Sequence, residues 1–227
     1  TPLYSSAASD VYKRQQRTSG ACISDPTEFF EVESVYCGPL FSGNGSYSNT
    51  SNWANSTIPA QGSSIRITGK MTLSQSVTYS DVRLMNGASI EIADGITLTI
   101  TGFLNNAGVI SGNGVVELSG ANGQTFSGGI VSNLYINNGS TVVQHSLSRI
   151  TNSLRLGNNQ ILNLSGQPTV LQSNRQKTAQ LAEVPSTSSI INANLFMVER
   201  WLDSLIVRNG ATTVSYTHLR AHETVLD

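Results

Sequence analysis

The sequence is poor in charged residues, which make up 12% of its 227 residues against about 25% in an average soluble domain. Thirteen Lys and Arg face fourteen Asp and Glu, for a formal net charge of −1. The chain therefore lacks the basic footprint with which proteins bind nucleic acid or an anionic membrane. We expect neither as a partner.

Long apolar runs and cysteines are also scarce. No apolar stretch approaches the about 20 residues of a membrane span, so we expect none in this chain. Cys22 and Cys37 flank "ISDPTEFFEVESVY". Without a CxxC motif or a nearby histidine they do not suggest a metal site, and a disulfide of an exported protein is the leading interpretation. Two free thiols, or partners elsewhere in a longer chain, are the alternatives.

Both termini resemble translated sequencing adapters. Ser5 to Gln15 and Val214 to Thr224 each match such a translation over eleven residues. We therefore set aside 1–15 and 213–227 as adapter-derived and expect an internal fragment from a metagenomic source. The histidine-rich end is then no site, and His145 is the one histidine that remains.

Ser, Thr, Asn and Gly take the place of the missing charges, and a small pattern recurs among them. Two apolar residues flank a third residue of any kind, and one or two polar residues and usually a glycine follow. The clearest copies are "IRITG" (65–69), "VRLMNG" (82–87), "IEIADG" (90–95), "LTITG" (98–102), "VELSG" (116–120), "LYINNG" (134–139), "LRLG" (154–157) and "LNLSG" (162–166). Alternation of this kind predicts short strands with one inward face and tight turns between them.

No single copy can bury its few apolar side chains alone, whereas stacked coils can. The spacing of 26 residues between Ile90 and Val116 favours three strands in a coil of about 25 residues. The sequence thus predicts an all-β fold, a right-handed parallel β-helix with a loop-rich N-terminal cap. An antiparallel β-sandwich made of the same short strands is the alternative.

This pattern suggests five segments. We expect Trp53 to cover the open end of the first coil, and residues 190–210 to return to strands, or to a strand and a short helix. The segments are the adapter-derived 1–15, a loop-rich cap at 16–63, the β-solenoid at 64–172, a connection and truncated strands at 173–212, and the adapter-derived 213–227.

Three stretches resemble secreted and cell-surface proteins of Bacteroidetes, the large repetitive kind exported by the type IX route. They are "GNGSYSNTSNWANSTIPAQGSSIRI" (43–67), "GASIEIADGITLTITGFLNNAGVISGNG" (87–114) and "TAQLAEV…INANLFMVERWL" (178–202). The resemblance implies an exported, adhesin-like module at the cell surface, with extracellular glycans or other surface proteins as partners. It transfers no catalytic residues. Trp201 stands where that family usually has tyrosine.

Carboxylates are the main candidates for chemistry. Glu91 and Glu117 are expected at the same outward position of adjacent coils, with Asp94 in a nearby turn. Stacked carboxylates could flank a glycosidic bond or hold calcium, but solvated side chains of an outer face fit the pattern equally. A polysaccharide lyase or glycosidase is therefore the alternative to a non-enzymatic structural module.

Aromatic residues could instead stack on sugar rings in a glycan-binding groove, with Trp53, Tyr47 and Tyr135 as the candidates. His145 would be the only general base, and no GxSxG pattern accompanies it. "SGNG" (111–114) lacks the spacing of a phosphate loop. We predict no cofactor and no metal, and a non-enzymatic module as the function.

Overall fold

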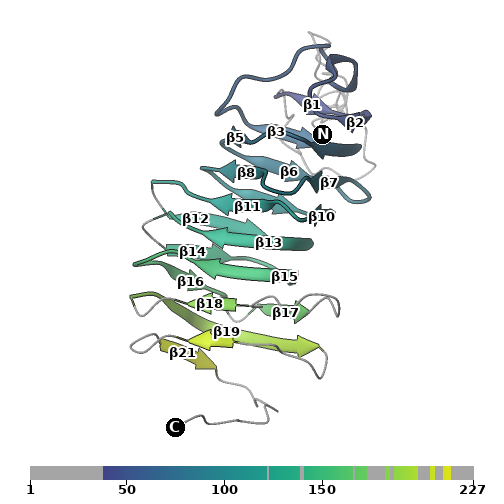
Figure 1. Cartoon of the computed structure of the whole chain (residues 1–227). Helices are drawn as coiled ribbons and strands as arrows, with labels where there is room; N and C mark the ends of the chain where they lie inside the picture. The colour runs from purple at the N-terminus through teal and green to yellow at the C-terminus, as the bar shows by residue number, and fades with distance from the viewer. Residues whose placement is uncertain are drawn as a thin grey trace, which may run out of the picture. The chain divides into compact units, whose positions relative to one another are not determined.

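The computed structural model describes residues 38–121, 123–138, 141–165, 167–172, 182–184, 187–198, 205–207 and 212–215. The chain divides into two compact units, Thr1–Gly38 and Pro39–Asp227, and every described strand belongs to the second. These strands stack as coils of a parallel β-solenoid, from the purple β1 to the yellow β21 (Figure 1). The predicted all-β parallel β-helix is confirmed, and the antiparallel sandwich is wrong.

The strands form three parallel stacks, so three strands per coil, as predicted, is confirmed. Stack 1 contains β1 (Leu40–Phe41), β3 (Ile65–Ile67), β6 (Val82–Leu84), β9 (Leu104–Asn106), β12 (Gln124–Ser127), β14 (Thr141–Gln144), β16 (Ile161–Asn163), the start of β19 (Ser189–Val198) and β21 (Thr212–Ser215). Stack 2 contains β2 (Asn44–Ser46), β4 (Lys70–Leu73), β7 (Ser89–Ile92), β10 (Val109–Gly112), the starts of β13 (Ile130–Ile136) and β15 (Ser148–Leu156), β17 (Pro168–Gln172) and the end of β19. Stack 3 contains β5 (Val77–Tyr79), β8 (Thr97–Ile100), β11 (Val115–Leu118), the ends of β13 and β15, β18 (Ala182–Val184) and β20 (Leu205–Val207).

The coils are shorter than the sequence suggested. Ile65 pairs with Val82, 17 residues later, and Ile90 pairs with Ile110, 20 residues later. The expected coil of about 25 residues is wrong here, because it took Ile90 and Val116 as partners. Val116 lies in β11 and belongs to a different stack.

Parallel pairing also extends beyond the expected solenoid of 64–172. At the N-terminal side β1 and β2 already pair with β3 and β4. At the other side β19 and β20 form where strands were expected between 190 and 210, and β19 pairs with β21. Strand β21 includes 213–215 of the adapter-like end; a ladder needs only main-chain N–H and C=O groups, so its formation fits either origin of those residues.

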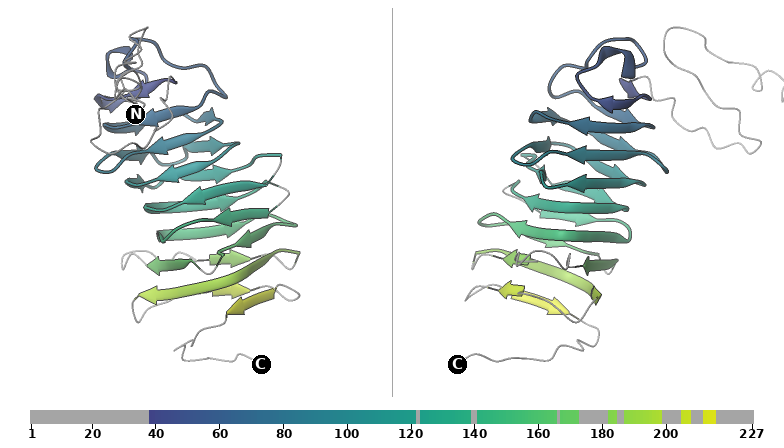
Figure 2. Two further views of the ribbon diagram at one scale, coloured as in Figure 1. Left: turned by 180° about the vertical axis from the view of Figure 1, so that it is seen from behind. Right: turned by 45° about the vertical axis from the view of Figure 1, so that its right-hand side comes forward.

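Alternate residues of each strand fill the interior with aliphatic side chains in register. In stack 2 the inward column runs through Met71, Ile90, Ile110, Val131 and Ile150, each at most 1% exposed. Full burial of one such side chain stabilises the fold by about 1.5–3 kcal/mol. The two further views in Figure 2 show the coils following one another without interruption. Each coil therefore supplies the surface that its neighbours need to bury.

The first coil is closed by a 3-10 turn, η2 (Thr50–Asn52), and the residue after it. Trp53 is 3% exposed, donates from Nε1 to the Tyr47 carbonyl at 2.8 Å, and meets the Phe41 ring edge-on at 5.2 Å. Its backbone bridges Phe41 in the antiparallel sense. This covers β1 of the first coil as predicted.

Corners between strands bring successive coils very close together. Gly112 in β10 has φ of 98°, and a Cβ there would overlap the Ile92 carbonyl of the preceding coil. Gly95, with φ of 71°, has open space in the same position. Only glycine therefore fits at Gly112, for two reasons that can be separated.

Substitution of Gly112 by alanine should destabilise the protein more than substitution of Gly95. Both changes place a side chain at positive φ, which costs about 1–2 kcal/mol. Gly112→Ala adds an overlap with Ile92, worth a further about 1–3 kcal/mol. Urea denaturation of both variants measures the difference, and equal losses would contradict the close approach of the coils.

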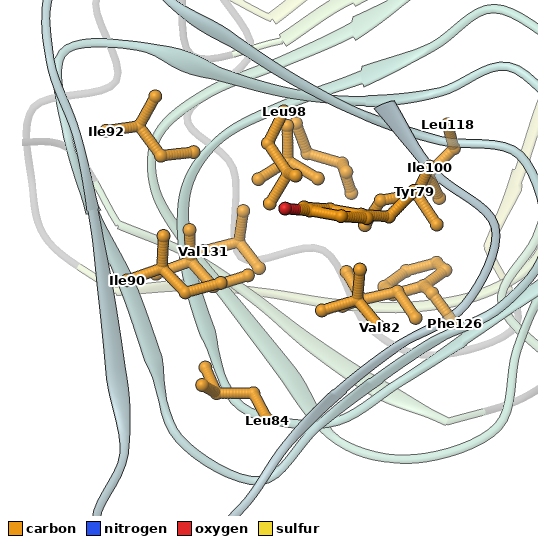
Figure 3. Close-up of a cluster of buried hydrophobic side chains, with 14 of the residues drawn as sticks. Tyr79, Val82, Leu84, Ile90, Ile92, Leu98, Ile100, Leu118, Phe126 and Val131 are labelled. Atoms are coloured by element: carbon orange, nitrogen blue, oxygen red, sulfur yellow. The ribbon is translucent and has the colours of Figure 1, made fainter. Parts of the chain in front are cut away.

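Tyr79 is the one aromatic residue with its hydroxyl deep in this core. Its ring lies among Val82, Leu98 and Ile100 (Figure 3). The residue is 0% exposed, and its hydroxyl has no hydrogen-bond partner among the described residues. Burial, and secondarily the charge of Tyr47, raise the pKa of Tyr79 above the usual 10.0.

Tyr79→Phe should raise the free energy of unfolding by about 1 kcal/mol, because it removes an unpaired buried hydroxyl. Tyr47→Phe is the matched control. The Tyr47 hydroxyl accepts a hydrogen bond from Gln75 Nε2, so its loss should lower stability by about 1 kcal/mol.

The same pair gives a pH dependence. The unfolded chain ionises Tyr79 near pH 10, whereas the folded chain ionises it only at higher pH, so this residue makes stability fall as the pH rises above about 10. The advantage of Tyr79→Phe in thermal or urea unfolding should therefore widen between about pH 8 and about pH 11. An advantage that stays constant would show that the hydroxyl is hydrated or paired.

Candidate functional site

The richest set of outward polar side chains lies on stack 3. Thr99 of β8, Glu117 of β11, Tyr135 of β13 and Arg155 of β15 occupy one column in register. They stand at the middle positions of "LTI", "VEL", "LYI" and "LRL", whose flanking residues point into the core. We call these four residues the Tyr135 column.

Contacts within the Tyr135 column hold its side chains in place. The Arg155 guanidinium carbon lies 5.0 Å from the centre of the Tyr135 ring, within the range of a cation–π contact. Glu117 Oε1 accepts from Asn137 Nδ2 at 2.9 Å, and its Oε2 accepts a long contact of 3.5 Å from Thr99 Oγ1. The column thus offers an ordered aromatic ring, a cation and a carboxylate, without a second carboxylate from Glu91.

The expected stacking of Glu91 on Glu117 is wrong. Glu91 of β7 pairs with Ser111 of β10 in stack 2, whereas Glu117 pairs with Thr99 in stack 3. Both carboxylates do point outward, and Asp94 is exposed in the turn between β7 and β8. They occupy separate faces, so the two-carboxylate arrangement of a glycosidase does not form from them in register.

The aromatic candidates divide in the same way. Trp53 and Tyr47 are 3% and 4% exposed, so their proposed role as glycan contacts is wrong: both rings are used to close the first coil. Tyr135 remains partly exposed on the outer face. His145 is exposed in the turn directly after β14, and its backbone N–H donates to the Phe126 carbonyl.

Two other sets of predicted residues fall outside the described residues. Cys22 and Cys37, the expected disulfide, lie there, as do Glu199 to Trp201 of the family-like "VERW". Among the residues that are described, no group of three or more His, Cys, Asp and Glu could hold a metal ion. No helix in the described part is long and apolar enough to cross a membrane.

Buried amides at the corners are functional in the fold, and the sequence did not single them out. Asn133 is 5% exposed and donates to the Gly114 carbonyl of the preceding coil at 2.9 Å. Its own oxygen accepts from Ser153 of the following coil at 2.8 Å and from Asn152. Asparagine was taken there as a turn former, because composition cannot show that an amide points inward.

A small apolar hollow of about 140 Å³ lies beside the first coil, lined by Pro39, Leu40, Trp53, Ala54, Asn55, Thr57 and Pro59. It contains no ionisable side chain. A hollow of this size could hold one small ring or a few waters, and its lining offers no group for acid–base chemistry.

Comparisons of the chain with protein-family models, with curated proteins and with solved structures gave no match.

The contact between Tyr135 and Arg155 is testable by a double-mutant cycle. Tyr135→Leu and Arg155→Met should show a coupling of about 0.5–1 kcal/mol in the free energy of unfolding, as expected for a cation–π pair near the surface. The pair Tyr135 and Arg149, which are not ladder partners, is the control and should show none. Absence of coupling in the first pair would mean that the guanidinium does not rest on the ring.

Proposed function

We propose that these coils form a non-enzymatic structural module, a stalk or adhesin segment of an exported cell-surface protein. The observation that carries this proposal is the in-register parallel pairing that continues from β1 to β21. A stack in which every coil is bonded along three strands to the next resists bending and holds other parts of a protein at a distance.

The outer face supports the same proposal. Ser, Thr and Asn occupy many of the outward positions, as in the column Thr72, Glu91 and Ser111 of stack 2. Such a surface is hydrated and does not promote edge pairing. Export and surface location rest on the resemblance of three sequence stretches to type IX-exported proteins.

Glycan binding is the second candidate, and the Tyr135 column is the specific observation in its favour. An ordered aromatic ring, the Asn137 amide and the Glu117 carboxylate are the groups that contact a sugar ring and its hydroxyls. This function would make the module adhesive without making it catalytic.

Force spectroscopy tests the structural proposal. Pulling on the chain by its ends should give a series of resisted steps, each releasing one coil of 17 to 22 residues. Each step should lengthen the chain by roughly 60–80 Å, at about 3.5 Å per residue. Extension without resistance would contradict a load-bearing role.

Incubation with a panel of polysaccharides separates the module from an enzyme. We expect no turnover by the unmodified protein. Turnover that is lost in Glu117→Gln but kept in Glu91→Gln would replace the structural proposal with a carbohydrate-active enzyme. Binding of a glycan without turnover, weakened at least tenfold by Tyr135→Leu, would support the adhesive form of the module.

A further inference from the structure

Exposed apolar residues are concentrated along one corner of the solenoid. The large apolar side chains with the greatest exposure among the described residues are Met85 (37%), Val109 (37%), Leu147 (55%) and Ile161 (38%). The first three all lie where stack 1 turns into stack 2. Met85 is in the turn between β6 and β7, Val109 begins β10, and Leu147 is in the turn between β14 and β15.

The outward column beside this corner continues the pattern. In register along stack 2 stand Lys70, Ser89, Val109, Ile130 and Arg149. Two apolar residues therefore occupy the centre of the column, and one cation lies at each end. With coils about 4.8 Å apart, the two cations are about 19 Å from each other.

The cations at the two ends are unusual in having nothing to bind. Arg83 lies over the Phe103 ring and Arg155 over the Tyr135 ring, and Arg66 is likewise engaged within the fold. Lys70 and Arg149 are exposed and make no ion pair or ring contact with any described residue. The described cations that remain available thus stand at either end of the apolar centre.

We propose that Met85, Val109, Ile130 and Leu147, with Lys70 and Arg149 at the ends, form a docking surface for a protein segment that has an apolar centre and two carboxylates about 19 Å apart. We call these six residues the corner surface. The apolar centre would provide affinity, and the two cations would fix the register of the partner.

Charge argues against the other occupants. A second copy laid along this surface brings like charges together, because either orientation places Lys70 or Arg149 opposite another cation. An anionic membrane would gain only about 1 kcal/mol from each cation, too little for stable attachment. Glu91, exposed on the same stack, opposes both a membrane and a uniformly acidic partner.

This proposal goes beyond the structural function and does not depend on it. A stalk that resists force but binds no acidic segment would leave the proposed function intact and remove the docking surface. The reverse result is equally distinguishable, since the two experiments measure extension under load and binding of a peptide.

The test uses the full chain and two capped peptides, Glu-Thr-Leu-Thr-Leu-Thr-Glu and its lysine-ended counterpart. When extended, each peptide presents its ends and both leucines on one face, with the ends about 20 Å apart. In an NMR titration the glutamate-ended peptide should bind at least tenfold more tightly. The double variant Lys70→Glu/Arg149→Glu should reverse this preference, and Val109→Ser/Ile130→Ser should weaken both peptides at least tenfold.

Thr78→Glu/Thr99→Glu, which changes two outward positions of stack 3, is the matched control and should leave binding unchanged. Equal binding of the two peptides, or no binding of either, would overturn the proposal. So would attachment to phosphatidylserine vesicles that the Lys70/Arg149 variant abolishes, which assigns the surface to a membrane. Dimerisation lost on Val109→Ser would assign it to a second copy and overturn the proposal equally.

Discussion

The structure depends on the main-chain ladder between successive coils. Each strand is three or four residues long in most coils and carries only two inward apolar side chains, so it has no stability of its own. The parallel ladder places each inward residue over its equivalent in the next coil, as along Val77, Leu98, Val116 and Leu134 of stack 3. Burial and hydrogen bonding therefore reinforce each other coil by coil, and neither alone would hold so short a strand.

The corners impose the second condition, because three turns per coil must pass directly over the turns below. Glycine is required where a carbonyl of the preceding coil occupies the place of a side chain, as Ile92 does at Gly112. Elsewhere an inward amide bonds across coils, as Asn133 does. The scarcity of charge follows from the same condition, since ionised groups could not replace these neutral amides in the interior without a large desolvation cost.

The strands themselves could be predicted from the sequence, because the alternation of apolar residues reports directly which face is inward. The coil length could not: "IEI" and "VEL" look alike, yet Ile90 and Val116 stand in different stacks, and only the register distinguishes them. The error over Glu91 and Glu117 has the same origin. Tyr135 and Arg155 could have been matched from the sequence, since each is the middle residue of its copy, but the burial of Trp53 depends on a turn that no repeat describes. What the outer surface binds is not encoded in the periodicity at all, because the ladder accepts any outward side chain.

Electron paramagnetic resonance distances along stack 2 test the stacking of coils most directly. Nitroxide labels would be placed at Arg149 and at one of Ser89, Lys70 or Asn44, in a chain with serine in place of Cys22 and Cys37. These positions are separated by three, four and five ladder steps. The account predicts narrow distributions near 14, 19 and 24 Å, rising by about 4.8 Å for each coil. Distances that fail to increase from Ser89 to Lys70 to Asn44 would contradict a parallel stack.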